Sequence, residues 1–167
     1  MQTPPSELFE RHHVKVYRFF LKMTGSRDVA QDLTQELFLR VVRYVNRCTP
    51  GRELPWMFQI GRNLVIDYRS EHADRPASLS DTHPAQTEPT QLVAFGLSEA
   101  LGLLSEADRE VFLLREVAGL SYPELAAACE TTQDNVRSRV CRARCRLKVL
   151  LGGRLSADEN KRRKHDG

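Results

Sequence analysis

Residues 121–150 read SYPELAAACETTQDNVRSRVCRARCRLKVL, and their pattern predicts the arrangement of two helices in the C-terminal half of the chain. Ser121 and Glu124 have the spacing of a capping box, which opens a short helix rich in alanine. A turn around Glu130 separates that helix from a longer one over about 133–151. Because small residues in the first helix allow the second to approach closely, the pattern predicts a helix-turn-helix.

The longer helix of this pair segregates its charges. Val136, Val140 and Leu147 recur at helical spacing and are expected to face inward. Six basic residues lie between Arg137 and Lys148, with no acidic residue among them. Arginine reads guanine bidentately and clamps phosphates, so we favour a DNA-recognition helix over a merely solvated basic face.

Helical periodicity dominates the rest of the chain as well. Apolar residues recur three and four positions apart, and Gly, Ser and Pro stand where helices would begin and end. No segment has the alternation of a strand. We therefore predict an all-α protein, with further helices over about 6–23, 26–47, 55–70, 92–104 and 105–119.

The segment 72–91 differs in composition from its surroundings. It contains three prolines among Ser, Thr, Asp and Ala, and it is poor in residues that form a core, as is typical of a flexible linker. It would join two small helical domains at 1–71 and 92–151, the second containing the helix-turn-helix. A pair of glycines is expected to end the last helix, which leaves 152–167 as a basic, disordered tail.

The overall composition sets limits on the class of protein. The chain has 167 residues, of which 41% are hydrophobic and 28% charged, enough for a compact core. No apolar run approaches the length of a membrane-spanning helix, and no secretory signal opens the chain, so we expect a cytoplasmic protein without membrane insertion. Cys141 and Cys145, one helical turn apart, would make at most half a zinc site, and we favour free thiols.

Several stretches together resemble bacterial RNA polymerase sigma factors. Residues 121–147 look like the domain that binds the minus-35 promoter element, and 103–112 look like the start of that domain. Residues 28–41 resemble the helix that binds the polymerase core, and 56–69 resemble the minus-10-binding helix. The two-domain layout is similar to the extracytoplasmic-function (ECF) group.

The resemblance implies a role for individual residues. Those expected to dock on the beta-prime clamp helices of polymerase are Asp32, Gln35, Glu36 and Arg40. Those expected at the minus-10 element are Arg52, Arg62, Asn63 and Arg69, with Asn63 beside an extruded base and the loop 48–54 forming part of its pocket. Those expected at the minus-35 element are Asn135, Arg137, Ser138, Arg139, Arg142 and Arg144.

The same resemblance implies the partners. It predicts core RNA polymerase, through the clamp helices and the beta flap, together with promoter DNA and an anti-sigma factor that controls the chain in a stress response. It predicts no catalytic residue, no cofactor and no metal. Two positions depart from the family pattern: Glu130 stands where a glycine is common, and Cys141 stands where a His or an aromatic residue often touches DNA.

Other interpretations remain open at this point. Asp28, Asp32 and Glu36 lie one turn apart and could in principle hold a metal or act in acid–base catalysis, but no His or Cys joins them at ligand spacing. A nucleic-acid enzyme is therefore less favoured than polymerase docking or a solvated helix face. A free-standing helix-turn-helix regulator would bind a palindrome as a dimer, and a pure protein-interaction module would leave the arginine helix unexplained. We expect Trp56 to belong to the core rather than to stack on bases.

Overall fold

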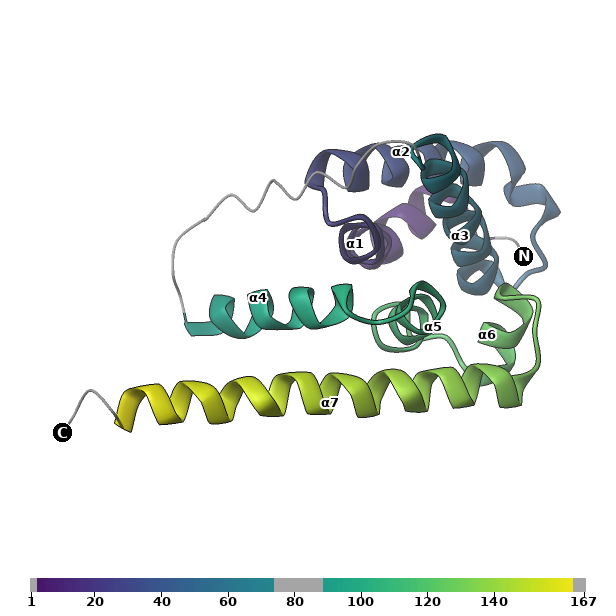
Figure 1. Cartoon of the computed structure of the whole chain (residues 1–167). Coiled ribbons are helices and arrows are strands. Elements are labelled where there is room, and N and C mark those ends of the chain that lie inside the picture. The colour runs from purple at the N-terminus through teal and green to yellow at the C-terminus, as the bar shows by residue number, and fades with distance from the viewer. Residues whose placement is uncertain (1–2, 74–88, 164–167) are drawn as a thin grey trace.

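The computed structural model describes the backbone of residues 3–73 and 89–163, and the side chains of residues 3–73 and 96–152. Throughout these residues the chain is helical and contains no strand, which confirms the predicted all-α fold (Figure 1). The elements in chain order are α1 (Pro5–Thr24), α2 (Arg27–Tyr44), a short 3-10 helix η1 (Val45–Arg47), α3 (Glu53–Glu71), α4 (Pro89–Gly102), α5 (Glu106–Glu116), α6 (Tyr122–Ala128) and α7 (Gln133–Arg163).

Local signals explain where the first helices end and begin. Gly25 adopts a left-handed conformation with φ of 71°, and its amide donates to the carbonyl of Leu21 at 2.8 Å, which closes α1. Ser26 then accepts a hydrogen bond from the amide of Val29 and caps α2. The tight junction returns α2 along α1, and the two helices pack together.

Gly61 lets α3 approach the other two helices of the N-terminal half. A Cβ at this position would lie 3.2 Å from Cδ1 of Leu37 on α2 and 3.4 Å from Cζ of Phe20 on α1. Phe20, Leu37 and Phe58 are all fully buried in the core beside it. The glycine therefore fixes how closely α3, which carries the predicted minus-10 residues, lies against the bundle.

The helix-turn-helix forms as predicted. The amide of Ser121 donates to Oε2 of Glu124 at 2.7 Å, and the Ser121 hydroxyl accepts from the amide of Glu124, so the capping box at the start of α6 is complete. Glu130, in the turn to α7, has φ of 51° and is the one non-glycine residue with positive φ among those described. Val136, Val140 and Leu147 are buried, as the spacing indicates.

Some predicted boundaries are wrong. The helix α7 does not end at Leu151, since it continues through Gly152 and Gly153 to Arg163, over residues that the sequence predicts to be a disordered tail. A glycine inside a helix costs about 1 kcal/mol relative to alanine, which weakens the helix without forbidding it. Most of the predicted linker, at 74–88, lies outside the described residues.

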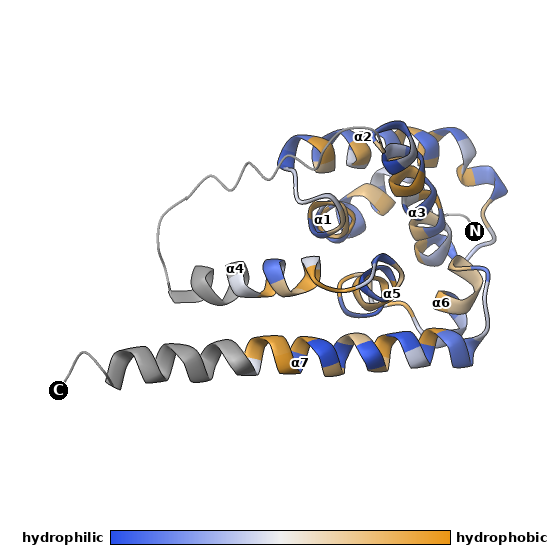
Figure 2. Cartoon of the chain, in the orientation of Figure 1, coloured by the Kyte–Doolittle hydropathy of each residue, from blue (hydrophilic) through white to orange (hydrophobic). Residues whose placement is uncertain are grey.

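The two halves pack against each other, which the sequence did not predict. The helix α3 packs against α6 and α1 packs against α5, while α7 runs along α4, α5 and α6 on the far side (Figure 1). Buried hydrophobic residues from both halves form one continuous core. Figure 2 shows hydrophobic and hydrophilic residues alternating along the helices, as expected of amphipathic helices that share such a core.

Candidate nucleic-acid interface

The outer face of α7 carries the residues predicted to bind the minus-35 element. Arg137, Ser138, Arg142 and Arg144 are exposed, whereas Asn135 and Arg139 are half-buried. The inner face is apolar, so the helix presents a row of guanidinium groups outward while its other side packs against α4, α5 and α6. This arrangement suits a helix that enters a groove of DNA.

Three of these arginines already have a partner within the same half. The Arg137 guanidinium lies over the ring of Tyr122 with its carbon 5.2 Å from the ring centre. Arg142 Nη2 lies 3.1 Å from Oδ1 of Asp108, and Arg144 pairs with Glu116 through Nε at 3.1 Å and through a second, shorter contact from Nη2. Asp108 and Glu116 belong to α5, so α5 holds these side chains along α7.

Asn135 is oriented by the start of its own helix. Its Nδ2 donates to Oγ1 of Thr131 at 2.9 Å, and its amide donates to Oγ1 of Thr132 at 3.2 Å. The threonine hydroxyl at 132 thereby caps α7. These bonds hold the Asn135 side chain against the turn.

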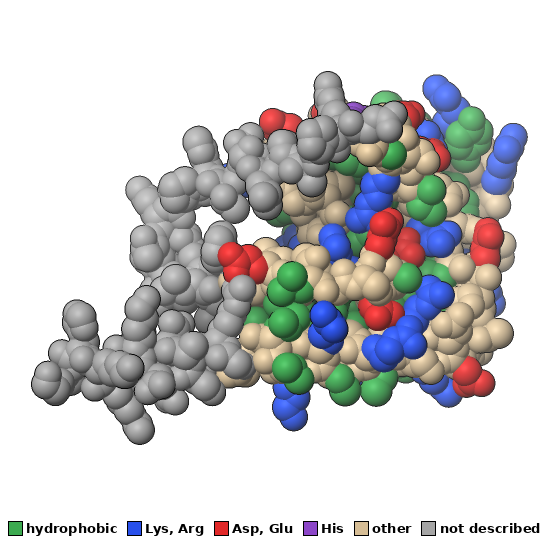
Figure 3. Space-filling model, viewed as in Figure 1, with side chains coloured by type: hydrophobic (Ala, Val, Ile, Leu, Met, Phe, Trp, Pro, Cys, Tyr) green, Lys and Arg blue, Asp and Glu red, His purple; other side chains and the backbone are tan. Residues whose placement is uncertain are grey.

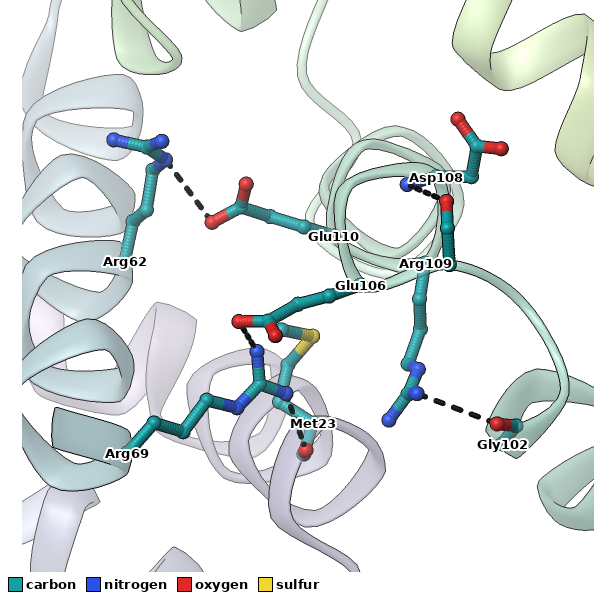
Figure 4. Close-up of polar contacts among 9 residues, drawn as sticks. Met23, Arg62, Arg69, Gly102, Glu106, Asp108, Arg109 and Glu110 are labelled. Carbon is teal, nitrogen blue, oxygen red and sulfur yellow. Dashed lines mark hydrogen bonds and ion pairs between the residues drawn. The ribbon is translucent and has the colours of Figure 1, made fainter. Parts of the chain in front are cut away.

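The predicted minus-10 residues, three on α3 and Arg52 just before it, divide into two pairs. Arg52 and Asn63 are exposed, whereas Arg62 and Arg69 turn toward the C-terminal half (Figure 4). Arg62 Nε lies 3.0 Å from Oε1 of Glu110, an ion pair without the geometry of a hydrogen bond. Arg69 Nη2 donates to the carbonyl of Met23 at 3.1 Å, and its Nη1 pairs with Glu106.

The loop predicted to form part of the minus-10 pocket lies against α6. A shallow cavity of about 190 Å³ is lined on one side by Arg52, Trp56 and Gln59 and on the other by Glu124 and Ala127. Trp56 is half-buried and packs against the core, in agreement with its predicted place. The first helix of the helix-turn-helix therefore covers one side of this loop.

The predicted polymerase-docking residues share the outer face of α2. Asp32 and Gln35 are exposed, and Glu36 and Arg40 are half-buried and pair at 2.7 Å between Oε1 and Nε. Two apolar residues near them, Leu39 and Val42, are 64% and 63% exposed. Neither residue was predicted as a docking residue, although the helical spacing places both off the buried stripe of α2.

Burial changes the acid–base behaviour of two groups near the contact between the halves. It raises the pKa of the Cys129 thiol to about 11, with a smaller contribution from Glu110, so this thiol is protonated at neutral pH. Burial also lowers the pKa of Arg69, as does the nearby Arg109, although an arginine stays charged.

The structure also bears on the metal and membrane alternatives. Within the part of the chain that the structure describes, no three His, Cys, Asp or Glu side chains gather as they would around a metal ion. None of the helices there is both long and apolar enough to span a bilayer.

The chain matches two families over most of its length. Residues 8–75 match "Sigma-70 region 2", and residues 95–147 match "Sigma-70, region 4". The chain is 37% identical over 141 residues to the ECF RNA polymerase sigma factor EcfG of Rhodopseudomonas palustris, covering 80% of this chain and 77% of EcfG. It is 32% identical over 154 residues to the ECF sigma factor SigM of Bacillus subtilis, covering 86% of this chain and 93% of SigM.

Solved structures show the same likeness. The chain resembles the sigma factor RpoE of Bartonella quintana, solved in complex with the anti-sigma factor NepR, with a TM-score of 0.73, 28% identity, and coverage of 88% of this chain and 96% of RpoE. It also resembles CnrH, solved in complex with the cytosolic domain of CnrY, with a TM-score of 0.70, 26% identity, and coverage of 89% and 88%. The helical bundle, the helix-turn-helix and these relatives lead to one conclusion: the chain belongs to the ECF family of RNA polymerase sigma factors.

Proposed function

We propose that the chain binds core RNA polymerase and directs it to promoters that carry its own minus-10 and minus-35 elements. The single observation that carries this proposal is the outer face of α7, where exposed arginines line the second helix of a helix-turn-helix in a sigma-70 region 4. Arginine-rich recognition helices contact both base edges and phosphates in the major groove.

The N-terminal domain would supply the other contacts. The α2 face of Asp32, Gln35, Glu36 and Arg40, widened by the exposed Leu39 and Val42, would dock on the beta-prime clamp helices. Arg52, Arg62, Asn63 and Arg69 of the α3 region would contact the opened minus-10 strand. Residues 72–91 would act as a linker that lets each domain reach its own element.

We also propose that an anti-sigma factor controls the chain and that the beta flap of polymerase holds region 4. Support for the first comes from two similar proteins whose structures were solved as complexes, the sigma factor RpoE with the anti-sigma factor NepR and CnrH with the cytosolic domain of CnrY. The chain would act where polymerase acts, in the cytoplasm. It would have no catalytic centre and no cofactor of its own.

Run-off transcription with purified core polymerase on a genomic library tests the proposal. We expect defined start sites that depend on the added chain. On a promoter found this way, Arg137→Ala and Arg142→Ala should each weaken binding by the holoenzyme, by about 1–3 kcal/mol where a base contact is lost. Lys15→Ala on exposed α1 is the matched control, since it removes a cation far from α7. Undiminished transcription with both arginines replaced would contradict the placement of α7.

A further inference from the structure

Two exposed cysteines lie on α7, among the arginines proposed to bind DNA. Cys141 and Cys145 are exposed, whereas the other two cysteines of the chain, Cys48 and Cys129, are buried. Figure 3 shows basic side chains over α7 with hydrophobic side chains, a colour that includes cysteine, next to them. Neither the hydrophobic core nor the proposed function accounts for a pair of exposed thiols on this helix.

The two thiols lie on one side of the helix, away from its buried stripe. Residues four apart in a helix are neighbours, so Cys145 lies one turn beyond Cys141. A rotation of about 100° per residue places Cys145 nearly opposite the middle of the buried stripe and Cys141 next to it on the outer surface. The stripe consists of Val136, Val140, Ala143 and Leu147. Both thiols therefore belong to the surface that α7 would turn toward DNA.

The spacing of the pair does not suit a disulfide bond. Cβ atoms four residues apart in a helix are separated by about 5–6 Å, whereas those of a disulfide are separated by about 3.5–4.5 Å. Closing that bond would distort a helix whose other side is packed into the core through Val140 and Ala143. A metal ion between the sulfurs adds the missing length, since two metal–sulfur bonds of about 2.3 Å in line separate the sulfurs by about 4.6 Å.

The number of ligands decides which ion fits this pair. A structural zinc site takes four ligands, and among the residues that the structure describes no third His, Cys, Asp or Glu joins the two thiols. The carboxylates that α5 directs at α7, Asp108 and Glu116, are paired with arginines. Thiolates select copper(I), and copper(I) is satisfied by two of them in a linear arrangement. Two thiols without a further ligand therefore favour copper(I) over zinc.

The charge around the pair also favours such a complex. Two thiols that bind one copper(I) ion release two protons, because thiolates are the ligands, and the complex carries a charge of −1 while the copper keeps its oxidation state. Arg142 and Arg144 stand between the two cysteines in the sequence, and no acidic residue occurs between Arg137 and Lys148. Opposite charges attract, so this basic face stabilises an anionic complex.

From these observations we propose that Cys141 and Cys145 form a two-thiolate site for copper(I) on α7. Its effect on transcription rests on the function proposed above. The complex adds a negative charge to the surface that must approach DNA phosphates, and it occupies the middle of that surface. The copper-loaded chain would therefore lose its contact with the minus-35 element, and promoters that need both elements would lose activity.

The first test measures copper binding by the full-length chain without DNA or polymerase. The reduced protein is titrated with copper(I) under anaerobic conditions, in competition with the chelator bathocuproine disulfonate. The wild-type chain is compared with Cys141→Ser, with Cys145→Ser and with the variant that carries both changes. All three variants retain the buried Cys48 and Cys129, so they serve as matched controls for binding by other thiols.

We expect the wild-type chain to bind one copper(I) ion, at least about tenfold more tightly than either single variant, because the second sulfur acts at a high effective concentration. X-ray absorption at the copper edge should show two sulfur neighbours, and loading with copper should leave the elution volume in size-exclusion chromatography unchanged. Single variants that bind as tightly as the wild-type chain, or a copper-dependent dimer, would overturn the proposed site.

Run-off transcription with core polymerase separates the copper site from the proposed function. Each protein is compared with itself, with and without copper(I), on a promoter that the wild-type chain uses. Copper(I) should reduce the wild-type transcript by about three- to tenfold, as expected when one phosphate contact is lost, and the double variant should not respond. An equal response in both proteins, or none in the wild-type chain, would contradict control by copper. Absence of transcription even without copper would contradict the proposed function, while the titration still decides whether the site exists.

Discussion

Glu130 is the residue on which the turn of the helix-turn-helix depends. Its φ of 51° lies in the left-handed region, where a side chain with a Cβ is strained. The turn of a helix-turn-helix commonly holds glycine at this position, so a left-handed backbone conformation could be predicted there from the sequence. The conformation forms even though the residue present is glutamate, which disfavours it.

Replacing Glu130 with asparagine should relieve that strain. Asparagine occupies the left-handed region several-fold more often than other non-glycine residues, so we expect Glu130→Asn to raise the free energy of unfolding by about 0.5 kcal/mol. Urea denaturation measures the change. Glu130→Gln keeps a long polar side chain and should give no increase, and an equal gain in both variants would mean that the backbone conformation is not the cause.

His12 makes the N-terminal domain sensitive to acid. Burial lowers its pKa below the ordinary 6.5, and the cations Lys15 and Arg11 lower it further, while Glu53 opposes them. The unfolded chain therefore binds this proton more readily than the folded chain, and the free energy of unfolding should fall as the pH decreases through 6.5 toward the lower folded pKa.

Substituting His12 with glutamine removes that proton equilibrium. The free energy of unfolding of His12→Gln, measured by urea denaturation between pH 7.5 and pH 5, should decrease less steeply than that of the wild-type chain. Identical slopes for the two proteins would show that other groups cause the acid sensitivity.

At the scale of the element, α6 depends on its capping box. The helix has only seven residues, so it cannot be stable by itself, and its first turn is held by Ser121 and Glu124. Its position helps to fix that of α7, the helix proposed to bind DNA, because the two helices pack directly on each other.

Removing the cap should therefore destabilise the C-terminal domain. We expect Ser121→Ala to lower the free energy of unfolding by about 1 kcal/mol, in chemical denaturation followed by circular dichroism. Ser98→Ala, on the exposed side of α4, is the matched control and should leave stability unchanged or slightly higher, since alanine favours the helix interior. A comparable loss in both would argue that serine hydroxyls matter for some reason other than capping.

The elements were predictable where the signal is local. Gly25 with Ser26, and Ser121 with Glu124, act within a few residues of themselves, so their hydrogen bonds follow from sequence spacing. The end of α7 was not predictable in the same way. The pair Gly152 and Gly153 weakens a helix locally, but the helix continues through both glycines. Local propensity alone did not decide the outcome there.

At the scale of the whole molecule, the proposed function requires that the two domains be held a set distance apart when both contact the promoter. Polymerase would impose that distance, and one base pair of extra spacer would rotate one element relative to the other by about a tenth of a helical turn. The proposed function therefore predicts a strict promoter spacing.

Lengthening the spacer between the minus-10 and minus-35 elements by five base pairs would place the minus-35 element on the opposite face of the duplex. We expect at least about a tenfold loss of run-off transcript, since region 4 can no longer engage while region 2 is bound. Lengthening by ten base pairs, which restores the face but not the distance, is the informative comparison. Transcription that is indifferent to both insertions would contradict bivalent reading.

The packing of the domains on each other could not be predicted from the sequence. Glu106 and Glu110 lie in a predicted helix, over about 105–119, and the resemblance predicts that Arg62 and Arg69 contact DNA. Neither pattern indicates a pairing between these glutamates and arginines. Their pairing joins residues 37 to 48 positions apart, and no spacing rule covers such contacts.

The four arginine–glutamate and arginine–aspartate pairs of α5 also affect how the free chain binds DNA. Binding to non-specific DNA strengthens with each phosphate that a cation neutralises, and four arginines of the chain already lie beside carboxylates of α5. We expect the free chain to bind non-specific DNA weakly, and to bind DNA strongly only as part of a complex with core polymerase.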